Sequence, residues 1–164
     1  MTLNTLVRPG LDQSSLRQLV HGIAGSHDLW RPLVRFGNRQ RWWTRLYGDS
    51  SVDVWLLTWL TDTSTDLHDH GGSAAAFTVV EGVLDELRVV DHTGTPQISR
   101  LRPGTDRHVA PGVIHDVRSP GPDPAISIHA YSPPLTTMTF YEQHGQQLVP
   151  IQSVPTDQPE PVSR

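Results

Sequence analysis

Cysteine is absent from the 164 residues of the chain. The protein therefore has no disulfide bond, no thiolate metal ligand and no cysteine nucleophile, so histidine, aspartate and glutamate are the candidates for binding a metal. The sequence also has no apolar stretch long enough to cross a bilayer. Its first residues, MTLNTLVRPG, show neither the basic start nor the apolar centre of a secretory signal. We therefore expect a cytoplasmic protein.

Positive charge is sparse and scattered along the chain. Charged residues make up 18% of the sequence, the net charge is −4, and no run of basic residues occurs. This argues against nucleic acid and anionic membranes as partners. Fourteen prolines and thirteen glycines predict many turns and few long helices. The length suits one domain with one core.

The N-terminal part, residues 1–40, carries the clearest helical pattern. The segment DQSSLRQLVHGIAG has apolar residues at helical spacing, with Asp12 or Ser14 as the N-cap and Gly25 as the end. The apolar residues at this spacing are Leu16, Leu19, Val20 and Ile23. We expect this short helical segment to pack on a β-barrel that follows it.

From residue 41 the sequence changes to short strand-like runs separated by turns. RWWTRLY and VDVWLLTWL are rich in aromatic and β-branched residues, and GDSS between them is typical of a hairpin turn. Seven or eight such runs predict an all-β fold, an antiparallel sandwich or barrel, over residues 41–150. The segment 151–164 has three prolines and little apolar content, which predicts a mobile tail.

The stretch LHDHGG places two histidines one residue apart. In a strand, His68 and His70 point to the same face while Asp69 points away. Alone, this pattern fits a metal site and two solvated histidines at a strand end equally well. His115 follows a PGVI turn at the start of a further run, and it supplies a third imidazole.

Two segments with these histidines resemble the motifs of the cupin superfamily, whose fold is a double-stranded, jelly-roll-like β-barrel. The first cupin motif usually has a glutamate soon after its two histidines, but here GGSAAAF follows and no acid occurs until Glu81. The resemblance therefore implies a site of three histidines. Such a site leaves up to three adjacent positions open on a six-coordinate metal, which suits Fe(II) and O₂ chemistry.

Three segments together resemble cysteine dioxygenase, a thiol dioxygenase of the cupin superfamily found also in bacteria. They are LHDHGGSAAAFTVVEG, IHDVRS and AISIHAYSPP. The resemblance implies a mononuclear non-haem Fe(II) bound by His68, His70 and His115. It also implies a catalytic relay of Ser127, His129 and Tyr131, a substrate-binding Arg45, and a cis peptide between Ser132 and Pro133. The tyrosine–cysteine crosslink of mammalian members cannot form, because the matching position is near Ala75.

The residues themselves are compatible with these roles. Ser127, His129 and Tyr131 alternate, so a strand would present all three on one face, where they could form a hydrogen-bonded chain. The alternative is that Tyr131 is an ordinary half-buried aromatic residue. A guanidinium can bind a carboxylate with two hydrogen bonds, which suits Arg45, although a solvated strand residue is the alternative. We expect the other arginines, Arg41 and Arg88 among them, to be solvated.

The resemblance thus implies an Fe(II)-dependent dioxygenase that adds both atoms of O₂ to the sulfur of L-cysteine and gives cysteine sulfinate. One alternative is a sister enzyme acting on 3-mercaptopropionate or another small thiol. Enzymes similar to cysteine dioxygenase that act on 3-mercaptopropionate carry glutamine at the position of Arg45. The arginine of this chain therefore favours cysteine as the substrate. Another alternative is a cupin binding protein without oxygenase activity. We expect a monomer.

Overall fold

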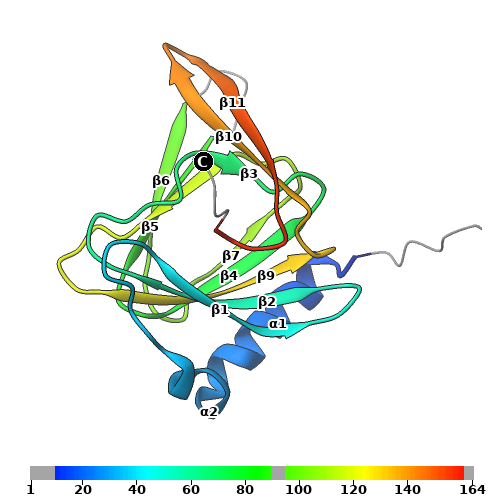
Figure 1. The fold of residues 1–164 in the computed structure, drawn as a ribbon, viewed down its shortest axis with the longest axis vertical. Helices are drawn as coiled ribbons and strands as arrows, with labels where there is room; N and C mark the ends of the chain where they lie inside the picture. Colours follow the sequence, from blue (N-terminus) through cyan, green and yellow to red (C-terminus); the bar gives the residue numbers. More distant parts are fainter. Residues whose placement is uncertain (1–9, 90–94, 161–164) are drawn as a thin grey trace, which may run out of the picture.

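The computed structural model describes residues 10–89 and 95–160, and nearly half of them lie in two antiparallel β-sheets that face each other (Figure 1). The five-stranded sheet has the order β1 (Trp42–Gly48), β2 (Asp53–Trp59), β9 (Ala125–Ser132), β4 (Ala74–Glu81), β7 (Asp106–Val109). The six-stranded sheet has the order β11 (Gln147–Pro155), β10 (Thr137–His144), β3 (His68–Asp69), β8 (His115–Arg118), β5 (Leu84–Val89), β6 (Pro96–Leu101). The expected all-β barrel architecture is confirmed.

Strands β2 and β9 are buried along their whole length because both faces of their sheet are covered. Residues of one alternation, such as Trp55 and Leu57, belong to the core between the two sheets. Residues of the other alternation, such as Leu56 and Ile128, belong to a second core on the outer face. The strands therefore have apolar side chains on both faces. Because these contacts hold the sheet from both sides, its inner face can also carry a few polar side chains.

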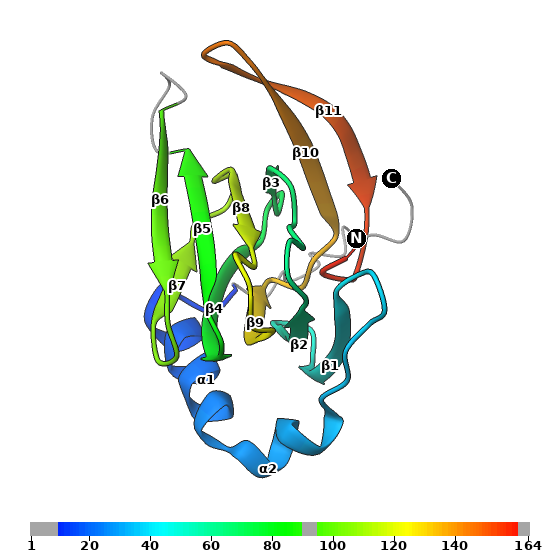
Figure 2. The same ribbon diagram turned by 90° about the vertical axis from the view of Figure 1, so that its left-hand side faces the viewer.

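The outer core is closed by α1 (Gln13–Gly25), which packs on β4, β9 and β7, while α2 (His27–Trp30) and the 3₁₀ turn η1 (Arg31–Leu33) follow it (Figure 2). The predicted helix is confirmed: Asp12 caps it by accepting a hydrogen bond from the backbone N–H of Ser15 at 2.8 Å. Leu16 and Val20, one turn apart, are fully buried. None of the helices among the described residues could cross a membrane.

The C-terminal part of the chain contains more strand than the sequence predicted. Strand β11 runs across the expected boundary at residue 150 and pairs with β10 up to the Pro155–Thr137 position. It is the edge strand of its sheet. Proline has no N–H to donate, and an edge strand tolerates Pro150 and Pro155 because it pairs with a neighbour on one side only. The division into 1–40, 41–150 and 151–164 stays a prediction.

The peptide bond between Ser132 and Pro133 is cis, as the resemblance implied, and Gly121–Pro122 is a second cis bond. The hydroxyl of Ser132 donates to the carbonyl of Ser51 at 2.6 Å and accepts from the N–H of Leu11 at 2.6 Å. Ser132 thereby ties the start of the described chain and the β1–β2 hairpin to the end of β9.

The turn between β4 and β5 depends on Gly82, and replacing it should destabilise the fold. Gly82 has φ of +74°, and a Cβ would lie 2.4 Å from the carbonyl oxygen of Pro124. Gly82→Ala should therefore lower the free energy of unfolding by about 3 kcal/mol, from the left-handed backbone and the clash together. Gly104→Ala is the matched control, because Gly104 also has positive φ (+86°) but has no atom within 4 Å of the Cβ position.

The control should lose only about 1–2 kcal/mol, the backbone part of the cost. Urea unfolding of the two variants and the parent protein measures the difference. Equal losses in both variants would contradict the close approach of Pro124.

Candidate metal centre

Three buried histidines from two neighbouring strands bring their ring nitrogens to one point. His68 on β3 pairs directly with His115 on β8, and His70 lies just after β3. The Nε2 atom of His70 is 3.0 Å from Nε2 of His68 and 3.4 Å from Nε2 of His115. Asp69 between them faces away, and it accepts hydrogen bonds from the Tyr141 hydroxyl and the Gly71 N–H. The structure therefore brings together the three residues that the sequence singled out.

Hydrogen bonds at Nδ1 fix the orientation of two of the rings. Nδ1 of His68 lies 2.8 Å from the carbonyl oxygen of Asp66, to which it donates. Asp66 has φ of +60°, a left-handed conformation that aspartate tolerates better than most residues, and this turn presents its carbonyl to the ring. With the proton on Nδ1, the Nε2 lone pair of His68 faces the other two histidines.

The Nδ1 atom of His115 donates to the carboxylate of Glu86, at 2.9 Å from Oε1. Glu86 is fully buried on β5, and it also accepts from Arg88 at 2.9 Å and from Arg107 at 2.6 Å. Burial would raise the pKa of Glu86, but the hydrogen bonds and charges of His115 and Arg88 outweigh it and hold the pKa at about 2. Glu86 is therefore an ionised acceptor that fixes the His115 tautomer.

The histidine cluster fits a divalent metal ion. Two nitrogens that lie about 2.1 Å from one ion are about 3.0 Å apart at a right angle and about 3.4 Å apart at the tetrahedral angle. The observed separations match these values. Burial, followed by the charges of His68 and His115, holds the pKa of His70 well below its usual range, so this ring is in the neutral form that metals bind. Nδ1 of His70 is buried without a hydrogen-bond partner among the described residues.

A small cavity adjoins the cluster. Its wall contains the three histidines, His129 and Tyr131, and the rest is mostly apolar. The apolar part includes Leu57, Ala75, Phe77, Val117 and Pro159. Such a wall excludes water and strengthens electrostatic interactions within the site.

Ser127 and His129 are joined on the inner face of β9, but the predicted chain of three continues to a different residue. Ser127 Oγ lies 2.8 Å from Nε2 of His129, and it accepts a hydrogen bond from Trp59 Nε1 at 2.8 Å. The rings of His129 and Tyr131 are 6.4 Å apart, and no hydrogen bond joins them in the described part of the chain. The connected set is thus Trp59, Ser127 and His129.

His129 is held as a neutral ring. It stacks on Phe77 with centroids 4.7 Å apart and an interplanar angle of 7°. Burial, followed by nearby positive charge that includes Arg41, lowers the pKa of His129 to about 3. Because Ser127 can donate to its Nε2, the remaining proton lies on Nδ1.

Tyr131 lies beside the histidines as an edge-to-face neighbour of His70, with ring centroids 5.1 Å apart. Burial and then the charge of Asp53 raise the pKa of Tyr131, so the phenol keeps its proton. Ala75 is the residue opposite Tyr131 in the β4–β9 register. The resemblance places the crosslinking cysteine of mammalian members near this position, where this chain has alanine.

Arg45 lies on β1 outside the cavity wall. Its guanidinium packs over the Trp55 ring at 4.6 Å from the centroid, and it lies 3.9 Å from a carboxylate oxygen of the buried Asp53. Its side chain is 48% exposed. In this conformation Arg45 contacts Trp55 and lies near Asp53, and it does not form part of the cavity wall.

Sequence reasoning missed the position or the role of four residues in this region. Glu86 and Trp59 were not assigned any role at the site, and the expectation that Arg41 is solvated is wrong. The Arg41 side chain is only 4% exposed and pairs with Glu160, and Arg88, expected to be solvated too, binds Glu86. Glu86 shares one strand face with the fully buried Leu84, which is the one sequence signal that could have placed it inside.

Comparison with known proteins gives a consistent fold. A TT1209 structure from Thermus thermophilus is 19% identical, with a TM-score of 0.56 over 63% of this chain and 92% of that one. An RmlC-like cupin protein from Desulfovibrio desulfuricans is 16% identical, with a TM-score of 0.53 over 62% and 91%. Recombinant oxalate oxidase in complex with glycolate is 13% identical, with a TM-score of 0.56 over 63% and 56%.

These likenesses show the cupin fold, and the sequence itself shows the family. The family model for cysteine dioxygenase type I matches residues 3–144, which is most of the chain. The matched range includes the three histidines and all of β9. The chain therefore belongs to the cysteine dioxygenase type I family, and its three-histidine site fits a metal-dependent dioxygenase.

Proposed function

We propose that this protein is an Fe(II)-dependent dioxygenase that adds both atoms of O₂ to the sulfur of L-cysteine and gives cysteine sulfinate. The observation that carries the proposal is the convergence of the Nε2 atoms of His68, His70 and His115 on one buried point beside a cavity. Membership of the family supports a small-molecule thiol and O₂ as the reactants. A cytoplasmic location and a monomeric state stay predictions.

The three histidines are the proposed iron ligands. When bound, Fe(II) would supply open positions for the thiol and O₂ and would lower the pKa of the thiol. Glu86 keeps the Nδ1 proton of His115 in place, and the Asp66 carbonyl does the same for His68. Both histidines are thereby oriented before a metal arrives, which reduces the reorganisation that binding requires.

Tyr131 and His129 form the proposed catalytic side of the cavity, with Ser127 behind them. Tyr131 is a protonated hydroxyl donor next to His70 and can hydrogen-bond the substrate. His129 is a neutral ring whose orientation is set by Ser127 and by stacking on Phe77. Trp59 extends this support through its bond to Ser127. The apolar wall then keeps water away from the sulfur.

Arg45 is the proposed substrate-binding residue for the carboxylate, on the basis of the resemblance. To reach a ligand in the cavity it has to leave its position over Trp55. Nearly half of the side chain is exposed, so it has room to move. A guanidinium that binds the carboxylate would fix the orientation of the amino acid while the sulfur reacts.

The reaction is tested by loading the protein with Fe(II) without oxygen, adding a thiol and ¹⁸O₂, and determining the product mass. L-cysteine should gain two labelled oxygen atoms, both on sulfur. Gain on 3-mercaptopropionate alone would replace cysteine by the alternative substrate. If neither thiol nor another small thiol consumes oxygen, the protein is a cupin binding protein and the proposal is wrong.

The role of Glu86 predicts a specific effect on metal binding. Glu86→Gln removes the charge that holds the His115 tautomer, and it should weaken Fe(II) binding by about 10–100-fold. Competition with a metal chelator measures the affinity. Asp85→Asn is the matched control, because Asp85 is the neighbouring acid but pairs with the exposed Arg100 on the surface. The proposed role is contradicted if both variants bind iron as the parent protein does.

The role of Arg45 predicts an effect on substrate binding that depends on the carboxylate. Arg45→Gln should raise KM for L-cysteine by about tenfold or more, since a charge-assisted bond to the substrate is lost. The amide of L-cysteine, which has no carboxylate, should show a much smaller change. Arg100→Gln serves as the control for the loss of one arginine, and its steady-state kinetics should match those of the parent protein.

A further inference from the structure

We propose that Arg41 is a second carboxylate-binding residue of this site and that Glu160, near the C-terminal end, occupies it until an acidic ligand arrives. The inference rests on the proposed function for the identity of the ligand, a small thiol that carries a carboxylate. It adds a residue and an internal competitor that neither the family match nor the resemblance assigns.

Arg41 is built into the inner side of the barrel rather than its surface. It immediately precedes β1, and its guanidinium packs over Trp59 at 4.9 Å from the ring centroid. Trp59 in turn donates to Ser127, which contacts His129. A buried guanidinium needs an anion close by, because leaving it uncompensated is costly. Arg41 is therefore a permanent anion-binding group one side chain away from the proposed catalytic residues.

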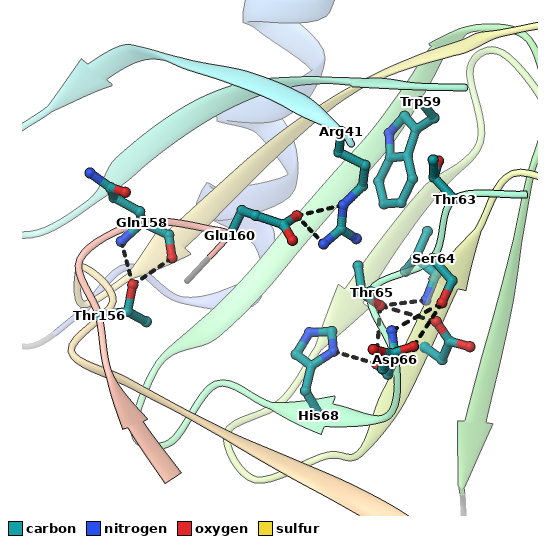
Figure 3. Close-up of polar contacts among 12 residues, drawn as sticks. Arg41, Trp59, Thr63, Ser64, Thr65, Asp66, His68, Thr156, Gln158 and Glu160 are labelled. Carbon is teal, nitrogen blue, oxygen red and sulfur yellow. Dashed lines mark hydrogen bonds and ion pairs between the residues drawn. The ribbon is translucent and has the colours of Figure 1, made fainter. Parts of the chain in front are cut away.

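The anion that Arg41 binds in this structure comes from the other end of the chain. Both Nε and Nη2 of Arg41 donate to the same oxygen, Oε2, of Glu160 (Figure 3). The two residues are 119 positions apart in the sequence. Figure 3 shows Glu160 extending from the C-terminal segment toward Arg41, with His68 below this pair in the view.

The segment that carries Glu160 lies beyond the last strand of the sheets. After β11, the N–H of Thr156 donates to the carbonyl of Thr136 at 3.0 Å, and the Thr156 hydroxyl bonds Gln158 within the segment. Pro159 is buried, and it forms part of the wall of the cavity beside the histidines. In Figure 1 this red segment turns back from the end of β11 toward the middle of the view. Pro159 and Glu160 thus act as a stopper with a carboxylate at its end.

The cavity with this stopper in place is too small for a substrate. Its free volume is about 10 Å³, roughly the room that one water molecule needs. A thiol amino acid can enter only if part of the wall moves, and Pro159 is the wall residue that follows the last described strand, β11. Movement of this segment leaves Arg41 without the Glu160 carboxylate, and a ligand carboxylate can replace it. A thiol without a carboxylate cannot replace Glu160 at Arg41, so the site selects thiols that carry a carboxylate.

Amide hydrogen exchange, measured under nitrogen, tests whether a ligand carboxylate replaces Glu160, and it does not depend on turnover. The Fe(II)-loaded full chain is incubated with L-cysteine, with 3-mercaptopropionate, or with the amide of L-cysteine, and exchange is followed in the peptide that contains residues 156–160. Both acids should speed exchange in this peptide, and the amide should not. If saturating amounts of both acids leave the exchange unchanged, the proposal is wrong.

Variants separate the two partners. Glu160→Gln removes the competing carboxylate, so the peptide of residues 156–160 should exchange quickly without ligand. This variant should bind L-cysteine and 3-mercaptopropionate about tenfold more tightly, as expected when the segment of the parent protein is closed about nine-tenths of the time. Arg41→Gln should also exchange quickly but bind the acids about tenfold more weakly. The double variant should bind like Arg41→Gln alone. Tighter binding in the double variant than in Arg41→Gln, or no tightening in Glu160→Gln, would overturn the proposal.

Matched controls on exposed ion pairs exclude a general effect of charge. Glu142→Gln and Arg100→Gln change the same residue types on the surface, and both should behave as the parent protein does. The outcome is also independent of the proposed reaction. Release of the segment by the acids without oxygen uptake in air would leave this inference intact and overturn the dioxygenase, whereas oxygen uptake without release would do the opposite.

Discussion

The hydrogen bonds at Nδ1 of His68 and His115 determine what the rest of the site can do. Each places a proton on the side of the ring that faces the protein, which leaves the Nε2 lone pair facing the centre. Three imidazole rings whose nitrogens approach one another have little reason to stay together unless a cation lies between them. The surrounding structure holds them there, through a left-handed turn at Asp66 and a buried carboxylate at Glu86.

Covering both faces of the five-stranded sheet makes this arrangement possible. The outer core under α1 and the inner core each contribute apolar contacts, so β2 and β9 are held firmly even though β9 carries Ser127, His129 and Tyr131. A sheet with only one covered face would lose much of its stability by presenting polar residues to its core. The helix on the outside therefore supports the chemistry on the inside, although none of its residues lines the cavity.

The sequence could predict features that depend on local periodicity. Helical spacing and Asp12 identify α1, and the alternation around His68 and His70 places two imidazoles on one side. Family resemblance then linked His115 to them. The strand LDELRV gave one weak indication, the apolar Leu84 on the same face as Glu86, because both of its alternating faces mix apolar and charged residues. Only the packing of Arg88, Arg107 and His115 around Glu86 decides that this acid faces inward.

Features that depend on distant parts of the chain were beyond sequence reasoning. The prolines of the last segment are typical of irregular chain, yet an edge strand accepts them, so β11 forms and leads Glu160 back to Arg41. No local pattern indicates an ion pair between residues so far apart. Composition likewise described Arg41 as one more surface arginine, whereas its position beside Trp59 makes it part of the interior.

The pairing of β3 with β8 also links the metal to the folding of the protein. Strand β3 has only two residues, and a single pair, His68 with His115, joins it to β8. An ion bound by both residues would add a link between the two strands and would favour the folded chain over the unfolded one. At a free metal concentration a hundred times the dissociation constant, the gain is about 2.7 kcal/mol. The supply of this metal ion would then govern how long the protein stays folded.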